Sequence, residues 1–230
     1  MNRVFLLLIM VVSASAVHAG VDIQHAACLG KPDAPIGAIY LHGMFPNSNK
    51  VPDPNGFKNL EARNLTELEA LAEKMGIRIA VPIAPFVKQT VATKKKKHSK
   101  KQPPLLGVRY WTSSKVPGHP TATLQQILKA SSAACGGEPI KKPIGLIGFS
   151  NGANMARILC NQQNDFFAVG AIGYNNDDEV KTDPTVCHGR ILEIKEHNAG
   201  LHSVELQRAL TPTTNGQPVR TAGEGDDVAS

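Results

Sequence analysis

The stretch "PIGLIGFSNGANMA", residues 143–156, joins a short apolar run to a helical pattern through two glycines and a serine. The apolar run predicts a buried strand, and the residues after Gly152 predict a helix. Between them lies the G-x-S-x-G pattern of a nucleophile elbow, which requires this strand, turn and helix. Side chains at Gly148 and Gly152 would collide across such a turn, and its serine is strained. We therefore predict that Ser150 is a nucleophile. The alternative is a glycine-rich turn in which Ser150 caps the helix.

The chain of 230 residues begins with a segment typical of export, MNRVFLLLIMVVSASAVHAG. A basic residue, a short apolar run and a small-residue motif ending at Ala19 predict a signal peptide over residues 1–19. The run is too short to span a membrane, and no later segment is apolar enough, so no transmembrane segment is expected after cleavage. The remainder is long enough for one domain with a core. We expect a periplasmic or secreted protein.

The four cysteines are Cys28, Cys135, Cys160 and Cys187. An even number in an exported chain favours disulfides, and four cysteines allow three pairings. We prefer Cys160–Cys187 with Cys28–Cys135; the alternative for Cys160 is a buried apolar thiol. There is no C-x-x-C pattern and no Cys/His cluster at zinc spacing, so no metal site is expected.

The net charge of +6 is concentrated in one segment, KKKKHSKKQPP, residues 94–104. Such a run predicts a solvated loop. The alternative is that Lys94–Lys101 bind an anionic surface, such as lipid or polysaccharide, with an affinity that falls with salt. No aromatic residues alternate with the lysines, so nucleic acid is not an expected partner.

Apolar, strand-like runs alternate with helical patterns along residues 20–210, which predicts a single α/β domain. Parallel strands joined by helices form a mostly parallel sheet covered by helices on both faces. The first helix is expected over residues 64–76, where Thr66 and Glu69 predict a capping box and Gly76 predicts the end. The polar tail, residues 211–230, is expected to be disordered. The strands are expected at residues 36–43, 77–85, 144–147, 166–174 and 190–195, with a second helix around residues 124–128.

Sites in such sheets lie beyond the carboxyl ends of the strands, where both Ser150 and the "LHGMFPNS" segment are placed. A His-Gly pair after a strand lets the backbone turn so that the following N–H groups face the elbow. The N–H groups of Met44 and Asn151 are the candidate oxyanion donors, because acyl transfer requires donors for the developing charge. His42 and Gly43 are expected to support this loop, as Gly148 and Gly152 support the elbow. His42 is not expected to be the base.

The chain resembles the exported α/β-hydrolases, in particular the esterases grouped with poly(3-hydroxybutyrate) depolymerases and feruloyl or acetyl-xylan esterases. The resemblance covers roughly residues 35–198 and is carried by "YLHGM", "GFSNGANMA", "FFAVGAIGY" and "CHGRILEIKEHN". It implies hydrolysis of carboxylic esters without a cofactor, with Ser150 as nucleophile and Met44 and Asn151 as oxyanion donors. It also implies an α/β-hydrolase-like fold. Because the tail is polar, whether this chain forms the last strand and helix of that fold is left open.

The chain departs from this family in its acid and its base. Family members carry HGTxD after the strand that corresponds to "RILEIK", whereas this chain has no Asp there. Glu196 is one candidate acid, since Glu replaces Asp in some triads; Asp178 or its neighbour Asp177 is the alternative. The family histidine lies near the carboxyl terminus, but here no histidine follows His202. We name His202 as the candidate base, ahead of His197.

These residues support two hypotheses about function. The first is an exported serine hydrolase that cleaves a carboxylic ester through an acyl-enzyme intermediate. A small or soluble ester is expected, because the sequence shows neither an aromatic sugar-binding platform nor a polymer-binding domain. The second is an inactive or truncated α/β-hydrolase domain that binds a ligand or an envelope partner, motivated by the missing late histidine.

Overall fold

The computed structural model describes residues 23–47, 57–58, 61–90, 105–111, 122–162, 166–173, 185–187, 190–194, 201–211 and 221–222. The predicted signal peptide over residues 1–19 lies outside the described residues. So do the basic segment 94–104, with Lys94–Lys101, and most of the tail 211–230.

The described elements alternate between strands and helices, as the sequence predicts. The strands are β1 (Gln24–Leu29), β2 (Ile36–Leu41), β3 (Phe45–Asn47), β4 (Arg78–Ile83), β5 (Phe86–Thr90), β6 (Leu105–Arg109), β7 (Ile144–Phe149), β8 (Phe166–Ile172), β9 (Arg190–Ile194) and β10 (Thr221–Ala222). The helices are α2 (Ala62–Met75), α3 (Leu124–Ala134), α4 (Asn151–Gln162) and α5 (Ser203–Leu210).

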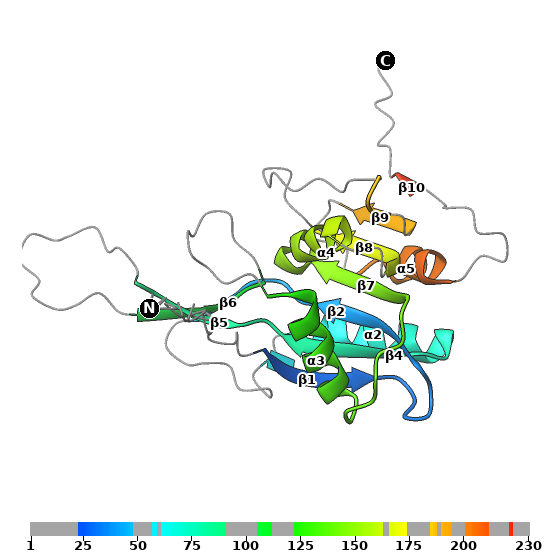
Figure 1. Ribbon diagram of the computed structural model, residues 1–230, viewed down its shortest axis with the longest axis horizontal. Coiled ribbons are helices and arrows are strands. Elements are labelled where there is room, and N and C mark those ends of the chain that lie inside the picture. The colour runs from blue at the N-terminus through cyan, green and yellow to red at the C-terminus, as the bar shows by residue number, and fades with distance from the viewer. Residues whose placement is uncertain are drawn as a thin grey trace, which may run out of the picture.

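The main sheet has the strand order β1-β4-β2-β7-β8-β9-β10. Only β1 runs antiparallel to its neighbour; the other pairs in this sheet are parallel. This confirms a mostly parallel α/β sheet. A second, antiparallel sheet of β3, β6 and β5 extends away from it (Figure 1). Strand β7, which leads into the predicted elbow, lies at the centre of the main sheet.

Helices cover both faces of the sheet. Successive side chains of a strand point to opposite faces, and on β2 Ile39 and Leu41 join one apolar cluster while Ala38 and Tyr40 join the other. The first cluster contains residues of α3 and α4, and the second contains residues of α2 and α5. The predicted two-faced arrangement is therefore confirmed.

The predicted capping box of the first helix is wrong. Helix α2 begins at Ala62, one turn before Thr66, and no side chain caps it. The Thr66 hydroxyl instead donates to the carbonyl of Ala62 at 2.8 Å, inside the helix. A threonine can satisfy its hydroxyl in this way as well as at a cap. The predicted end is confirmed, because Gly76 adopts the left-handed conformation that terminates α2.

Helix α5 was not predicted, because it is short and shows few apolar repeats. It packs on β8 and β9, and its leucines lie over strand glycines. A Cβ added to Gly145 of β7 would lie 2.6 Å from Leu210, and one added to Gly170 of β8 would lie 2.5 Å from Leu206. Gly145 pairs with Ala168, two residues before Gly170, so α5 runs antiparallel to the strands. Its amino end therefore lies at the carboxyl edge of the sheet.

The tail contributes a short edge strand, although the sequence predicts disorder over residues 211–230. Thr221 and Ala222 form β10 and pair in parallel with Leu192 and Glu193 of β9. Pairing at a sheet edge uses backbone groups, which the apolar pattern of the tail does not reveal. The remaining tail residues after Thr211 lie outside the described residues.

Both preferred disulfides are confirmed. Cys28 of β1 is bonded to Cys135 at the end of α3, and Cys160 of α4 is bonded to Cys187 before β9. The two bonds attach the edge strand β1 to α3 and the segment before β9 to α4, on the same face of the sheet. They indicate an oxidising compartment, as in extracellular or periplasmic proteins.

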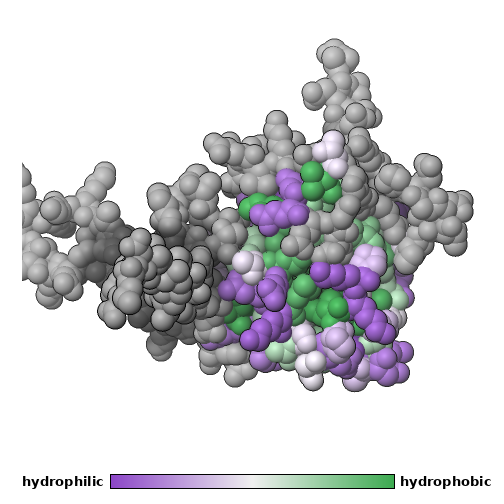
Figure 2. All heavy atoms as spheres, viewed as in Figure 1, coloured by the Kyte–Doolittle hydropathy of each residue, from purple (hydrophilic) through white to green (hydrophobic). Residues whose placement is uncertain are grey.

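The described surface exposes few large apolar side chains. Among the described residues these are Met44, Val186 and Val204. Figure 2 shows hydrophilic and hydrophobic residues interspersed over one face of the domain. Within the described part of the chain, no helix combines the length and hydropathy needed to cross a membrane.

Candidate active site

Ser150 lies in a tight turn between β7 and α4. Its φ is 51°, and the only other described non-glycine residue with a positive φ is His202. Left-handed backbone is costly for such residues and persists where the surroundings enforce it. The Ser150 N–H donates to the carbonyl of Ile172 on β8 at 2.8 Å, and its own carbonyl accepts from Ala153 at 3.0 Å. The turn thus has the backbone geometry of a nucleophile elbow.

The two elbow glycines are required by close backbone approach. A Cβ on Gly148 would overlap the carbonyl of Gly152 and lie 2.6 Å from the Ala153 Cα. A Cβ on Gly152 would overlap the Leu41 carbonyl at the end of β2 and lie 2.6 Å from the His42 carbonyl. The first turn of α4 therefore packs directly on the chain leaving β2.

The His-Gly loop lies against the elbow. A Cβ added to Gly43 would lie 3.4 Å from the Ser150 Cβ and 3.5 Å from the Phe149 ring. Met44 follows and is 54% exposed. The loop after β2 and the serine turn after β7 thus lie against each other through Gly43, the residue before Met44. An oxyanion hole would require the Met44 and Asn151 N–H groups to face the space beside the serine.

His42 is a buried structural residue. Its Nδ1 donates to the Gly43 carbonyl at 2.5 Å, and its Nε2 accepts from the Ala84 N–H at 2.9 Å. The pKa of His42 is lowered to about 3, chiefly by burial and also by the positive charge of Arg109, while the hydrogen bond to Gly43 opposes the shift. Both ring nitrogens form hydrogen bonds to backbone groups, so His42 holds the loop and has no free nitrogen to act as a base.

Trp111 links the His-Gly loop after β2 to the start of α4. The sequence did not predict this link. Its indole Nε1 donates to the His42 carbonyl at 3.0 Å, and its backbone N–H donates to Oδ1 of Asn151 at 2.7 Å. The ring is fully buried, with its centroid 5.3 Å from that of His42. Its position directly after β6 was the available signal, but no motif surrounds it. Trp111 therefore holds Asn151, which is itself a candidate oxyanion donor, and His42, which lies two residues before the other candidate, Met44.

A second buried network joins β2 to the start of α2. The Tyr40 hydroxyl donates to Oε2 of Glu61 at 3.0 Å, and Nδ2 of Asn64 donates to the same oxygen at 2.7 Å. Burial raises the pKa of the Glu61 carboxyl, while the two hydrogen bonds oppose this rise. The network sets the position of α2 beside the strand that carries His42. No motif in the sequence indicates this pairing.

His202 lies immediately before the first residue of α5, at the carboxyl edge of the sheet. Its φ is 49°, and its Nε2 is buried without a hydrogen-bond partner in the described part of the chain. The structure therefore brings His202 to the same edge as Ser150 but shows no hydrogen bond between His202 Nε2 and the serine. The other predicted partners, Glu196, His197, Asp177 and Asp178, lie outside the described residues.

An ion pair connects α4 to the strand that leads to Glu196. Nε of Arg157 lies 3.0 Å from Oε1 of Glu193 on β9, and the Arg157 side chain is only 6% exposed. This ion pair therefore holds helix α4, which follows Ser150, at a set distance from strand β9.

Among the described residues, no group of three or more His, Cys, Asp or Glu is arranged to hold a metal ion.

Comparison with known proteins leaves the family open. No protein-family model matches the chain, and no curated protein matches it. A solved structure to which it is similar is that of the protein Atu2452, of unknown function, from Agrobacterium tumefaciens strain C58. The two are 19% identical, the match covers 82% of this chain and 77% of that one, and the TM-score is 0.34. The chemistry of the site therefore has to be argued from its own residues.

The first prediction concerns the charge of His42. Because its pKa is lowered from 6.5 to about 3 in the folded protein, the unfolded chain takes up the proton first on acidification. Its contribution to stability is present above pH 6.5 and falls toward pH 3, by about 1.4 kcal/mol per pH unit. Denaturant unfolding of the parent and of His42→Gln should show a stability difference that shrinks in this window. An NMR titration midpoint near 6.5 for His42 in the folded protein would contradict the assignment.

Proposed function

We propose that the protein is an exported serine hydrolase that cleaves carboxylic esters through an acyl-enzyme intermediate on Ser150. The observation that carries this proposal is the strained turn at Ser150, enclosed by Gly148 and Gly152 and placed against the Gly43 loop. Residues that cap a helix typically have extended backbone, so capping alone does not call for the positive φ of Ser150.

We further assign the sheet to the α/β-hydrolase architecture. The support is topological: the central strand β7 ends in the serine turn, and its neighbour β2 ends in the His-Gly loop. The helix after the serine covers one face, and α2 with α5 covers the other. The parallel pairing brings the ends of β2 and β7 to the same edge, which is where a serine hydrolase needs its nucleophile and its oxyanion donors.

The reaction begins when the Ser150 hydroxyl attacks the ester carbonyl carbon. A bond forms between Oγ and that carbon, and the hydroxyl proton passes to Nε2 of His202. The N–H groups of Met44 and Asn151 stabilise the negative charge on the carbonyl oxygen. The ester C–O bond then breaks, and the alcohol leaves with the proton from His202. Water, deprotonated by the same nitrogen, then attacks the acyl carbon. The bond from that carbon to Oγ breaks, Ser150 takes the proton back from His202, and the carboxylic acid leaves.

The second prediction tests the nucleophile. Ser150→Ala should lower the hydrolysis of p-nitrophenyl acetate or butyrate by more than about 1,000-fold, because the residues of such a site act as a unit. A fluorophosphonate should label the parent at Ser150 and leave the variant unlabelled, as mapped by mass spectrometry. Ser131→Ala is the matched control, since the buried Ser131 hydroxyl on α3 forms no hydrogen bond with any described residue. Equal rates for parent and Ser150→Ala would refute the proposal.

The third prediction tests the link made by Trp111. Trp111→Phe keeps the backbone N–H to Asn151 but removes the indole donor to the His42 carbonyl. It should lower kcat at least about 10-fold with little change in KM, since a misplaced oxyanion donor affects the transition state. Phe166→Leu is the control for a change in the size of a buried aromatic side chain. Phe166 is buried at the amino end of β8, away from Ser150. If both variants lose kcat equally, the link has no catalytic role.

A second candidate function is a ligand- or envelope-binding domain without catalysis. The observation that favours it is the buried Nε2 of His202, which forms no hydrogen bond to Ser150. This candidate predicts a folded protein whose serine does not react with fluorophosphonate. Stoichiometric labelling of Ser150 would exclude it.

A further inference from the structure

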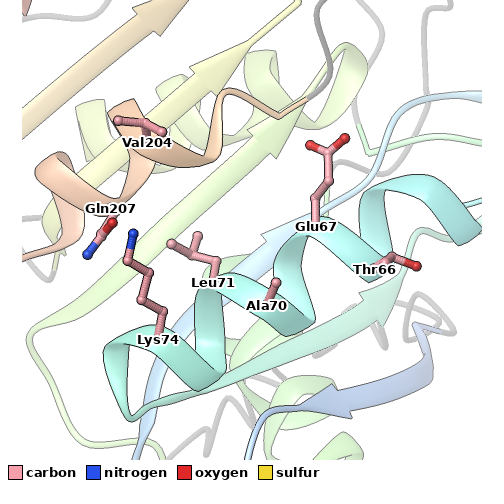
Figure 3. A pocket seen from close by; sticks show the side chains of 7 residues that line it. All are labelled: Thr66, Glu67, Ala70, Leu71, Lys74, Val204 and Gln207. Atoms are coloured by element: carbon pink, nitrogen blue, oxygen red, sulfur yellow. The ribbon is translucent and has the colours of Figure 1, made fainter.

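Glu67 of α2 reaches the chain that carries His202. Its Oε2 accepts a hydrogen bond from the Leu201 N–H at 2.9 Å, across 134 positions of sequence. Figure 3 shows Glu67 pointing from α2 toward the segment that enters α5, at one end of a groove of about 280 Å³ between these helices. Its other oxygen, Oε1, lies 3.2 Å from Nε of Arg63. The exposed Arg63 adds little stability, but it orients the carboxylate.

This hydrogen bond acts directly beside a strained residue. His202 follows Leu201 and has a φ of 49°, which is costly for a residue with a Cβ. On the other side, the His202 carbonyl accepts from the Leu206 N–H at 2.9 Å, in the first turn of α5. The backbone of His202 is therefore fixed from both sides. Glu67 holds the chain just before His202, which the hydrogen bonds of α5 do not reach.

The packing of α5 sets the height of His202 along the sheet. Leu210 lies over Gly145 and Leu206 lies over Gly170. The four-residue step from Leu210 back to Leu206 therefore moves along the strands toward their carboxyl ends. One more step of about 6 Å brings His202 level with Ile172. The carbonyl of Ile172 accepts the Ser150 N–H at 2.8 Å. The candidate base and nucleophile thus share one level at the carboxyl edge.

The ring of His202 carries a cost that a merely structural histidine would avoid. Its Nε2 is buried and has no hydrogen-bond partner among the residues that the structure describes. Leaving a buried polar atom unpaired costs about 1–3 kcal/mol, and such atoms in native proteins call for an explanation. A nitrogen that accepts a proton during the reaction provides one. Its surroundings must then hold the ring in place without occupying Nε2.

We propose that Glu67 is the positioning residue for His202, holding the Leu201 amide so that the imidazole faces the carboxyl edge beside Ser150. The inference rests on the proposed serine hydrolase function. The sequence predicts that an acid after β8 or β9, Asp178 or Glu196, orients the base. The inference adds an orienting residue on α2. Glu67 acts through the backbone of the residue before the base and does not touch the substrate.

The fourth prediction compares Glu67→Leu and Glu67→Gln in the full mature chain. Glu67→Leu removes the acceptor and should lower kcat for p-nitrophenyl butyrate about 10- to 100-fold at similar KM, part of the 10²–10⁴ that a positioned base supplies. Glu67→Gln retains an acceptor oxygen and should stay within about threefold of the parent. Glu73→Leu, on the same helix, is the matched control. Hydrogen exchange of the Leu201 amide should be faster in Glu67→Leu than in Glu67→Gln.

The outcomes separate the inference from the function on which it rests. A parent that neither hydrolyses esters nor reacts with fluorophosphonate would refute the hydrolase proposal, and the positioning role with it. An active parent in which Glu67→Leu matches Glu73→Leu in kcat would overturn the positioning role alone. So would an active parent whose rate survives His202→Asn. Loss of kcat in Glu67→Leu, with rescue in Glu67→Gln and wild-type activity in Glu73→Leu, supports it.

Discussion

The backbone of α4 approaches the end of β2 so closely that no side chain fits at Gly152. This contact sets the rest of the site. It presses the first turn of α4 against the chain leaving β2, so the turn before it must be sharp, and Ser150 takes up the positive φ. It also brings the Gly43 loop so near the serine that a Cβ added at Gly43 would contact the Ser150 side chain. A larger residue at Gly152 would separate the nucleophile from the loop that is proposed to stabilise its oxyanion.

The parts of the candidate site around Ser150 and around His202 are held by different means. The part around Ser150, the proposed nucleophile, is held inside the protein, where the neutral His42 ring, Ala84 and Trp111 form a continuous set of buried hydrogen bonds. The part around His202, the proposed base, is held nearer the surface, by the hydrogen bond that the Leu201 N–H donates to Glu67 and by the packing of α5 on strand glycines. Buried, fully satisfied networks are rigid, whereas partly exposed contacts yield more easily. The distance between Ser150 and His202 therefore depends mainly on how α5 sits on the sheet.

Much of the fold was predictable, because strong local patterns determine it. The strands around residues 36–43, 77–85 and 144–147 are continuous apolar runs, and both disulfides followed from where their cysteines lie. Helix α5 was missed because it presents only Leu206 and Leu210 to the sheet, too few for a period. The Thr66 capping box failed because the same residue pattern fits inside a helix. Of the site, the turn and its loop were predictable from glycines, which report backbone constraints. The roles of Trp111 and Glu67 were not, since they arise from contacts between distant segments.

The proposed hydrolase requires an oxyanion hole formed by the Ser150 turn and the Gly43 loop together. A crystal structure of the protein after reaction with a p-nitrophenyl phosphonate would show whether this hole exists. We expect a phosphonyl group bonded to Ser150 Oγ, with its oxygen about 2.7–3.1 Å from the Met44 and Asn151 nitrogens. Folded protein with an unmodified Ser150, or an adduct whose oxygen points away from both nitrogens, would refute the proposed oxyanion hole.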